Sequence, residues 1–211
     1  LNQVLDRATK GGVIDIELGL SRDGPNFIRP FRDALFLARS PDPKSFDAGC
    51  ILTNASPIIL DDEIRFYYGG YDQGATGADD TKLISGIGLA TIPRGRFAGI
   101  SPVVYSDQQT LLTPLEHIGQ VTLKPLDLSR IESITLNADA RQGNIRVEML
   151  TERGLRIKDF TKEDALPITG DALDHPVVWR EKSLADLGEG LFILRVYLEC
   201  ATAYAIDLLQ H

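Results

Sequence analysis

Short segments in which apolar and polar residues alternate limit most strongly how this chain can fold. In residues 13–20, acidic residues and a glycine alternate with Ile14, Ile16, Leu18 and Leu20. A period of two places successive side chains on opposite faces of a half-buried strand. No stretch of the sequence shows the sustained 3.6-residue period of an amphipathic helix. The sequence therefore predicts an all-β protein with under about a tenth of its residues in helices.

The front half of the chain is predicted to form antiparallel meanders of short strands. The turn residues at 21–25 should fold residues 13–20 back onto an extended run that begins at Phe27. A second hairpin is expected from residues 87–91 and 96–100. Aligning Ile16 with Ile87 pairs the two hairpins and suggests a repeated propeller blade, the alternative being two unrelated hairpins. Between them the sequence predicts strands at 49–53, 56–60 and 63–70 and an exposed loop at 72–82.

The back half is predicted to be a β-sandwich with about six strands. Residues 159–174 are acidic without the spacing of a calcium-binding loop, so they are expected to be a solvated loop. Trp179 is the only tryptophan and is predicted to anchor the core, the alternative being a platform for a sugar ring. The expected strands are 121–124, 131–137, 144–150, 177–179, 194–198 and 204–208.

Composition and charge exclude several classes of partner. The net charge of −8 leaves no basic surface of the kind that binds nucleic acid. The longest apolar runs are much shorter than the roughly 20 residues that a membrane-spanning helix needs. Cys50 and Cys200 show no metal-binding spacing and are predicted to be buried thiols, and His117, His175 and His211 are expected at the surface. We expect no metal, no cofactor, no nucleic acid and no membrane partner.

Several segments resemble the closing blades of bacterial propeller proteins related to glycoside hydrolase families 32 and 43. They are IELGLSRDGPNFIRP (16–30), SFDAGCILTNASPIILDDEIRFYYGGYDQG (45–74) and GIGLATIPRGRFAGIS (86–101). LNADARQGNIRVEML (136–150), DFTKEDALPITGDALDHPVVW (159–179) and LRVYLECATAYAI (194–206) resemble the β-sandwich that follows the propeller in family 32-like chains.

The resemblance implies a domain organisation and a function. Residues 1–110 would form partial β-propeller-like blades, and residues 111–211 would form the β-sandwich. The protein would be a carbohydrate-active glycoside hydrolase-like protein of the fructosidase or arabinosidase type, secreted or periplasmic. The alternative is a carbohydrate-binding or scaffold protein without catalysis.

Three carboxylates are candidate catalytic residues, because glycoside hydrolysis commonly uses two carboxyl groups beside the scissile bond. Asp47 precedes a predicted strand, and Asp72 leaves one beside Tyr68 and Tyr71, whose rings could contact a sugar. Asp23 and its neighbour Arg22 lie in a hairpin turn, where a bracing role is the alternative. The predicted site residues are therefore Asp23, Asp47 and Asp72 for catalysis and Arg22, Tyr68 and Tyr71 for substrate binding.

The catalytic set is incomplete in this sequence. The first-blade nucleophile motif of the two families is absent, and the dipeptide Glu199-Cys200, which matches a family 32 signature, falls in the predicted sandwich. An unclosed run of blades also leaves strand edges and apolar faces exposed. We therefore expect little glycosidase activity from the chain alone, and a homodimer with its contacts in residues 1–70.

Overall fold

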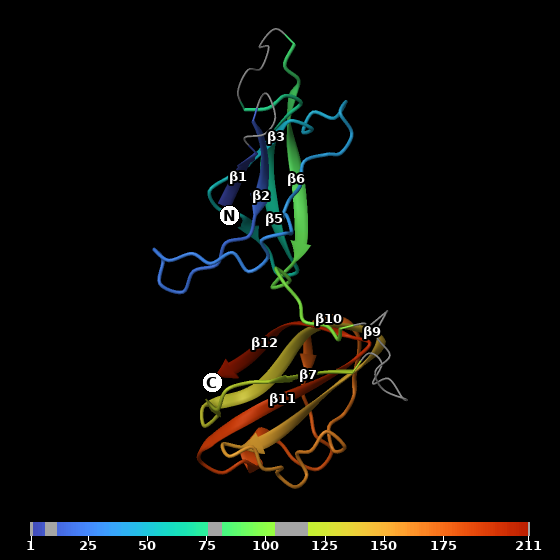
Figure 1. Cartoon of the computed structure of the whole chain (residues 1–211). Helices are drawn as coiled ribbons and strands as arrows, with labels where there is room; N and C mark the ends of the chain where they lie inside the picture. Colours follow the sequence, from blue (N-terminus) through green and yellow to red (C-terminus); the bar gives the residue numbers. More distant parts are fainter. Residues whose placement is uncertain (1, 7–11, 76–81, 104–117, 211) are drawn as a thin grey trace, which may run out of the picture. The chain divides into compact units, whose positions relative to one another are not determined.

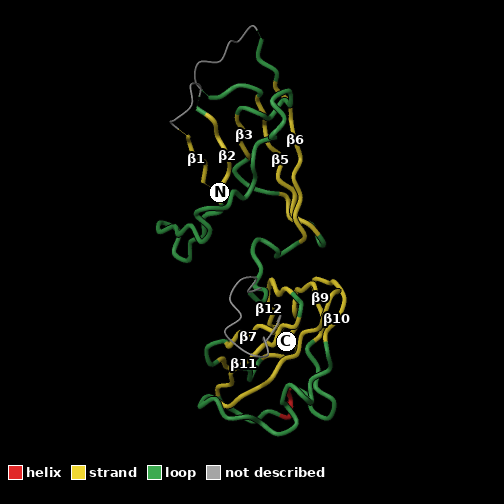
Figure 2. The backbone as a smooth tube through the Cα atoms, turned by 45° about the vertical axis from the view of Figure 1, so that its right-hand side comes forward, coloured by secondary structure: helices red, strands yellow, loops and turns green. Residues whose placement is uncertain are grey.

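The computed structural model describes residues 2–6, 12–75, 82–103 and 118–210 (Figure 1). The chain is all-β, as predicted, and among the described strands only the pairing of β2 with β3 is parallel. Two compact units are present, Leu1–Arg94 and Gly95–His211, which we call the first and second units. The predicted domain boundary at residues 110 and 111 lies outside the described residues. The only helix in the described ranges is a three-residue 3₁₀ turn, Leu184–Asp186 (red in Figure 2), so no described helix could span a bilayer.

The first unit contains one sheet built around β5. β5 pairs along its whole length with β6, and its other edge is shared by β3 and β4. β2 joins β3 through a single parallel pair, Ile14 with Cys50, and β1 lies outside β2. The strands are β1 (Asn2–Asp6), β2 (Val13–Glu17), β3 (Cys50–Thr53), β4 (Ile58–Ile59), β5 (Glu63–Tyr71) and β6 (Ser85–Pro93).

The alternating residues of β2 supply part of the first unit's core. Ile14 and Ile16 are buried, as their period of two predicts. Ile64 and Phe66, at alternate positions of β5, are also buried. Phe36, from the segment that pairs with Ile16, packs edge-on against Phe66 with ring centroids 5.3 Å apart. The core therefore joins strands that are far apart in the sequence.

Both predicted hairpins differ from the structure. The first is reduced to one bridge, in which Leu20 and Ile28 exchange backbone hydrogen bonds of 2.9 and 2.8 Å. The second is absent, because β6 pairs with β5 and Ile100 instead pairs with Ala203 in the second unit. The alignment of Ile16 with Ile87 was therefore wrong as evidence for a repeated hairpin, and the described residues form no closed propeller.

The second unit is organised by the long strand β9. Its first half pairs with β12 and with most of β10, and its second half pairs with β11, which also pairs with β7 and β8. The first residue of β10, Ile168, pairs with Ile145 in the second half. Residues 131–137 and 144–150, predicted as two strands, are one continuous strand. The elements are β7 (Ile118–Thr122), β8 (Leu126–Asp127), β9 (Ile131–Thr151), β10 (Ile168–Pro176), β11 (Leu191–Glu199) and β12 (Thr202–Gln210).

Both halves of β9 contribute to one core, although the inward-facing positions change between them. Even-numbered residues such as Leu136 are buried before the change, and odd-numbered residues such as Val147 are buried after it. Between the two halves, Gly143 lies so close to β11 that an added Cβ atom would be 1.9 Å from the Glu199 carbonyl oxygen. Only glycine fits this approach.

The core confirms the prediction for Trp179, which is buried. Its Nε1 donates to the Val147 carbonyl at 3.0 Å, and its ring meets Phe160 edge-on at 5.2 Å. The prediction of a solvated loop at 159–174 was wrong, because Phe160 is buried and β10 begins at Ile168.

The thiols and histidines also depart in part from expectation. Cys50 is buried as predicted, whereas Cys200 is exposed. Cys200 follows directly after β11 with a positive φ of 45°. His175 is partly buried with its Nε2 3.2 Å from the Ala138 carbonyl, and His117 and His211 lie outside the described residues.

Candidate functional site

Asp23 braces an exposed turn. Its Oδ1 accepts the Asn26 backbone N–H at 3.0 Å and the Ser21 hydroxyl at 3.1 Å, and its Oδ2 accepts the Asn26 side-chain amide at 2.6 Å. The Asn26 hydrogen bonds are the main reason that the pKa of Asp23 lies below its usual value of 3.8. Arg22 is exposed beside it. The geometry accounts for Asp23 as a turn residue, and the turn needs Gly24 for its positive φ of 87°.

Asp47 is buried, with 8% of its surface exposed, and both of its carboxylate oxygens are occupied. Oδ1 accepts the Ser45 hydroxyl at 2.5 Å, and Oδ2 accepts the Tyr68 hydroxyl at 2.9 Å. Burial raises the pKa of Tyr68, and the hydrogen bond to Asp47 raises it further. Asp47 and Tyr68, two of the predicted site residues, are thus brought together as a fixed pair.

The ring of Tyr68 packs on the sheet. It stacks with Phe46 at 6.4 Å and an interplanar angle of 11°, and the two rings cover Gly88 and Gly86 of β6, respectively. A Cβ atom at Gly88 would be 2.1 Å from the Tyr68 ring, and one at Gly86 would be 2.8 Å from the Phe46 ring. Glycines therefore make room for two aromatic rings on this face of the sheet.

Asp72 is the predicted catalytic residue that lines a pocket of the first unit. Its Oδ1 accepts the Ile84 backbone N–H at 2.9 Å, which fixes the carboxylate at the end of β5. Asp23 and Asp47 are not among the lining residues, and Tyr71 is half-buried outside the lining. The pocket has a volume of about 480 Å³, and we call it the β2 pocket; its lining is Asp15, Leu35, Ala38, Arg39, Ser40, Pro41, Pro43, Ala48 and Asp72.

The β2 pocket contains an ion pair that the sequence analysis did not identify. Arg39 donates from Nε to both carboxylate oxygens of Asp15 at 3.1 Å, and its backbone N–H donates to Oδ1 at 2.8 Å. Its Nη1 donates to the Ala48 carbonyl at 3.0 Å. Burial raises the pKa of the nearby Cys50 thiol, while the charge of Arg39 opposes that rise. In the sequence, Asp15 lies between the apolar residues Ile14 and Ile16. This alternation indicated only that its side chain faces away from the core of a strand.

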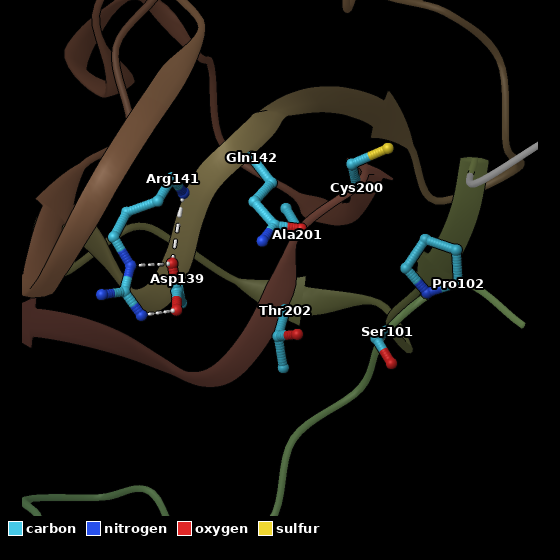
Figure 3. A pocket seen from close by; sticks show the side chains of 8 residues that line it. All are labelled: Ser101, Pro102, Asp139, Arg141, Gln142, Cys200, Ala201 and Thr202. Carbon is cyan, nitrogen blue, oxygen red and sulfur yellow. Dashed lines mark hydrogen bonds and ion pairs between the residues drawn. The ribbon is translucent and has the colours of Figure 1, made fainter.

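The second unit has a larger pocket of about 860 Å³, lined by residues of β9, by residues 200–202 at the connection from β11 to β12, and by residues 101–102 (Figure 3). Arg141 and Asp139 lie side by side in it, with Nε to Oδ1 at 2.9 Å and Nη2 to Oδ2 at 2.5 Å. The Arg141 side chain is the main reason that the pKa of Asp139 falls to about 2. Hydroxyl, amide and thiol groups complete the lining, from Ser101, Gln142, Cys200 and Thr202.

No residue group suited to a metal ion was found in the described part of the chain, where no three His, Cys, Asp or Glu side chains cluster. Comparisons with protein-family models, with curated proteins and with solved structures found no match to this chain.

Proposed function

We propose that this chain is a carbohydrate-binding, glycoside hydrolase-like protein that binds a sugar in the β2 pocket and does not hydrolyse it alone. The observation that supports the proposal most directly is the fixed arrangement of Asp15, Arg39 and Asp72 around one pocket. The resemblance to the family 32 and 43 propellers makes fructosides and arabinosides the first ligands to test.

The chemistry of the β2 pocket suits a polyhydroxylated ligand. Nη2 of Arg39 has no hydrogen-bond partner among the described residues, so it can donate to a sugar hydroxyl. The carboxylates of Asp15 and Asp72 can accept from hydroxyls through lone pairs that their present bonds leave free. Leu35, Pro41 and Pro43 add an apolar wall that can face the C–H groups of a sugar ring.

Hydrolysis by the chain alone is disfavoured by the environments of Asp15, Asp23 and Asp47. Hydrolysis needs one carboxyl group as acid and a second as nucleophile or base on the two sides of the scissile bond. Asp47 is buried in hydrogen bonds, Asp15 is held by Arg39, and Asp23 braces an exposed turn. These interactions favour binding over catalysis.

Binding is expected to depend on Arg39 and Asp72. In calorimetric titrations with fructo- and arabino-oligosaccharides, Asp72→Asn and Arg39→Gln should each weaken binding by about fivefold or more, because each removes a charged hydrogen-bonding group. Arg32→Gln removes an equal charge from an exposed position outside the pocket and should leave the affinity within about twofold. Aryl glycosides should not be turned over. Equal loss in all three variants would contradict the assignment of the site, as would turnover that Asp47→Asn abolishes.

Self-association is the second part of the proposal. Large apolar side chains are exposed in the first unit, including Ile28 at 67% and Ile87 at 83%. Such side chains in one unit favour association with another copy. We expect a homodimer by light scattering at micromolar concentration, and the double variant Phe27→Ser, Ile28→Ser should shift it towards monomer. The matched double variant Leu155→Ser, Leu166→Ser, in exposed positions of the second unit, should remain dimeric; a wild-type monomer would refute the expectation.

A further inference from the structure

A polar ladder crosses from β9 to β11 on the face of these strands that points away from the core. The neighbouring residues Ile145, Val147 and Leu198 are buried in the core, so the residues that alternate with them face the other way. Three cross-strand pairs form the ladder: Asn144 with Glu199, Arg146 with Tyr197, and Glu148 with Arg195.

One end of the ladder is closed. Glu148 is fully buried; its Oε1 accepts Arg156 Nε at 2.6 Å and its Oε2 accepts the Tyr197 hydroxyl at 2.7 Å. Arg195 Nη1 lies 3.6 Å from Oε2 of the same carboxylate. Burial is the main cause that raises the pKa of Tyr197, followed by its bond to Glu148. Tyr197 is therefore held in place from the closed end.

The other end opens into a pocket of about 410 Å³, which we call the ladder pocket. Asn144, Arg146, Tyr197 and Glu199 come from the ladder, and Lys162 and Arg180 come from segments beside it. Lys162 Nζ lies 4.9 Å from the centroid of the Tyr197 ring. Arg146 Nη1 donates to the Lys162 and Ala165 carbonyls at 3.3 and 2.9 Å, which fixes the guanidinium beside the pocket.

The charges of the ladder pocket favour an anion. Its lining contains three cationic side chains and two acidic ones: Arg146, Lys162, Arg180, Glu163 and Glu199. The negative charge of Glu163 is already paired with Arg156 at 3.1 Å. The Arg180 side chain makes no hydrogen bond or ion pair with a described residue, and its charge is one of the causes that lower the pKa of Asp164. A local surplus of positive charge is notable in a chain with a net charge of −8.

We propose that the ladder pocket binds the carboxylate of an acidic sugar, a uronic acid residue. Lys162, Arg180 and the free part of the Arg146 guanidinium supply the cations that a carboxylate prefers. At the rim, the Asn144 amide donates to Glu199 at 2.8 Å, and this pair offers both a donor and an acceptor to ring hydroxyls. The preference for a carboxylate rests on the ladder pocket alone, and the choice of a sugar as its carrier rests on the proposed function.

The test uses the full chain with trigalacturonate, with the neutral trisaccharide galactotriose, and with triglutamate as a peptide that carries the same acidic group. Calorimetry should give a Kd of about 1 mM or below for trigalacturonate, weakening at higher salt, and at least about fivefold weaker binding of the other two. The double variant Lys162→Gln, Arg180→Gln should lose at least about fivefold in affinity. The matched double variant Arg153→Gln, Lys158→Gln changes the charge equally at exposed positions and should stay within about twofold.

Three results would overturn the proposal: no binding of trigalacturonate, equal binding of galactotriose or triglutamate, or equal loss in both double variants. Arg146→Ala is avoided because this side chain also holds the carbonyls of residues 162 and 165. Asp72→Asn separates the two sites, since it should weaken oligosaccharide binding in the β2 pocket and leave trigalacturonate binding intact. Failure of one site therefore does not imply failure of the other.

Discussion

Replacement of Trp179 by alanine is expected to lower the free energy of unfolding of the second unit by about 3–5 kcal/mol. The indole ring is buried against Phe160, so its removal leaves a cavity in the core. It also removes the N–H donor that satisfies the Val147 carbonyl in the middle of β9. Urea denaturation followed by circular dichroism measures the change, since the variant lacks the only tryptophan of the chain.

Two variants separate the contributions of the Trp179 ring and its N–H group. Trp179→Phe keeps an aromatic ring but loses the donor, and it should cost about 1–2 kcal/mol. Leu155→Ala alters an exposed side chain of the same unit and should cost under about 0.5 kcal/mol. If Trp179→Ala and Leu155→Ala had equal effects, Trp179 would not be the anchor of the core.

The sequence pattern predicted the type of structure better than its connections. The strands around Ile16, Val147 and Leu198 follow their period of two, because burial on one face selects apolar residues at alternate positions. The continuity of β9 could not be predicted, since the inward-facing positions change from even to odd between Ala140 and Ile145. A change of this kind breaks the alternation that sequence analysis uses to follow a strand.

β10 was missed for a related reason. Its pairing with β9 has register shifts on both sides of the segment from Gly170 to Ala172, so its residues show no regular alternation. Gly170 has a positive φ of 83°. The Asp171 carboxylate forms ion pairs with Arg96 and Arg141, so it is not a free surface charge. Acidic residues in this segment therefore suggested a loop although they belong to a strand.

The candidate site was predictable only where a residue sits at the end of a predicted strand. Asp72 meets this condition and lines the β2 pocket. Arg39 reaches Asp15 because Leu37 pairs with Ile16 across a long intervening segment, with backbone hydrogen bonds of 3.0 and 3.1 Å. No local pattern in the sequence encodes this pairing, so the Asp15–Arg39 pair emerges only from the fold.

The segment after β6, which does not form the predicted second hairpin, places Arg96 against three strands of the second unit. Ile100 pairs with Ala203 of β12, and Arg96 lies four residues before it in the segment that follows β6. Its Nε donates to Asn137 Oδ1 at 2.8 Å, and its Nη2 bonds Asp171 and the Ala172 carbonyl. The guanidinium also lies 4.6 Å from the centroid of the Tyr204 ring. One side chain thus connects β9, β10 and β12.

Arg96→Ala is expected to lower the free energy of unfolding of the second unit by about 2–4 kcal/mol. The Arg96 side chain is only 11% exposed, and its removal deprives the Asp171 carboxylate and the Ala172 carbonyl of the hydrogen bonds that Arg96 donates. Trp179 fluorescence during urea denaturation measures the change, because this tryptophan lies in the core of the same unit.

Conservative variants decide whether the geometry of the Arg96 guanidinium or only its charge matters. Arg96→Lys keeps the charge but cannot bond three acceptors with one planar group, so it should recover less than half of the lost free energy. Arg141→Ala removes a mostly exposed arginine that also lies near Asp171, at 3.7 Å, and should have a much smaller effect. Full recovery in Arg96→Lys would show that Arg96 acts through its charge, and an effect of Arg96→Ala no larger than that of Arg141→Ala would show that the three strands do not depend on this contact.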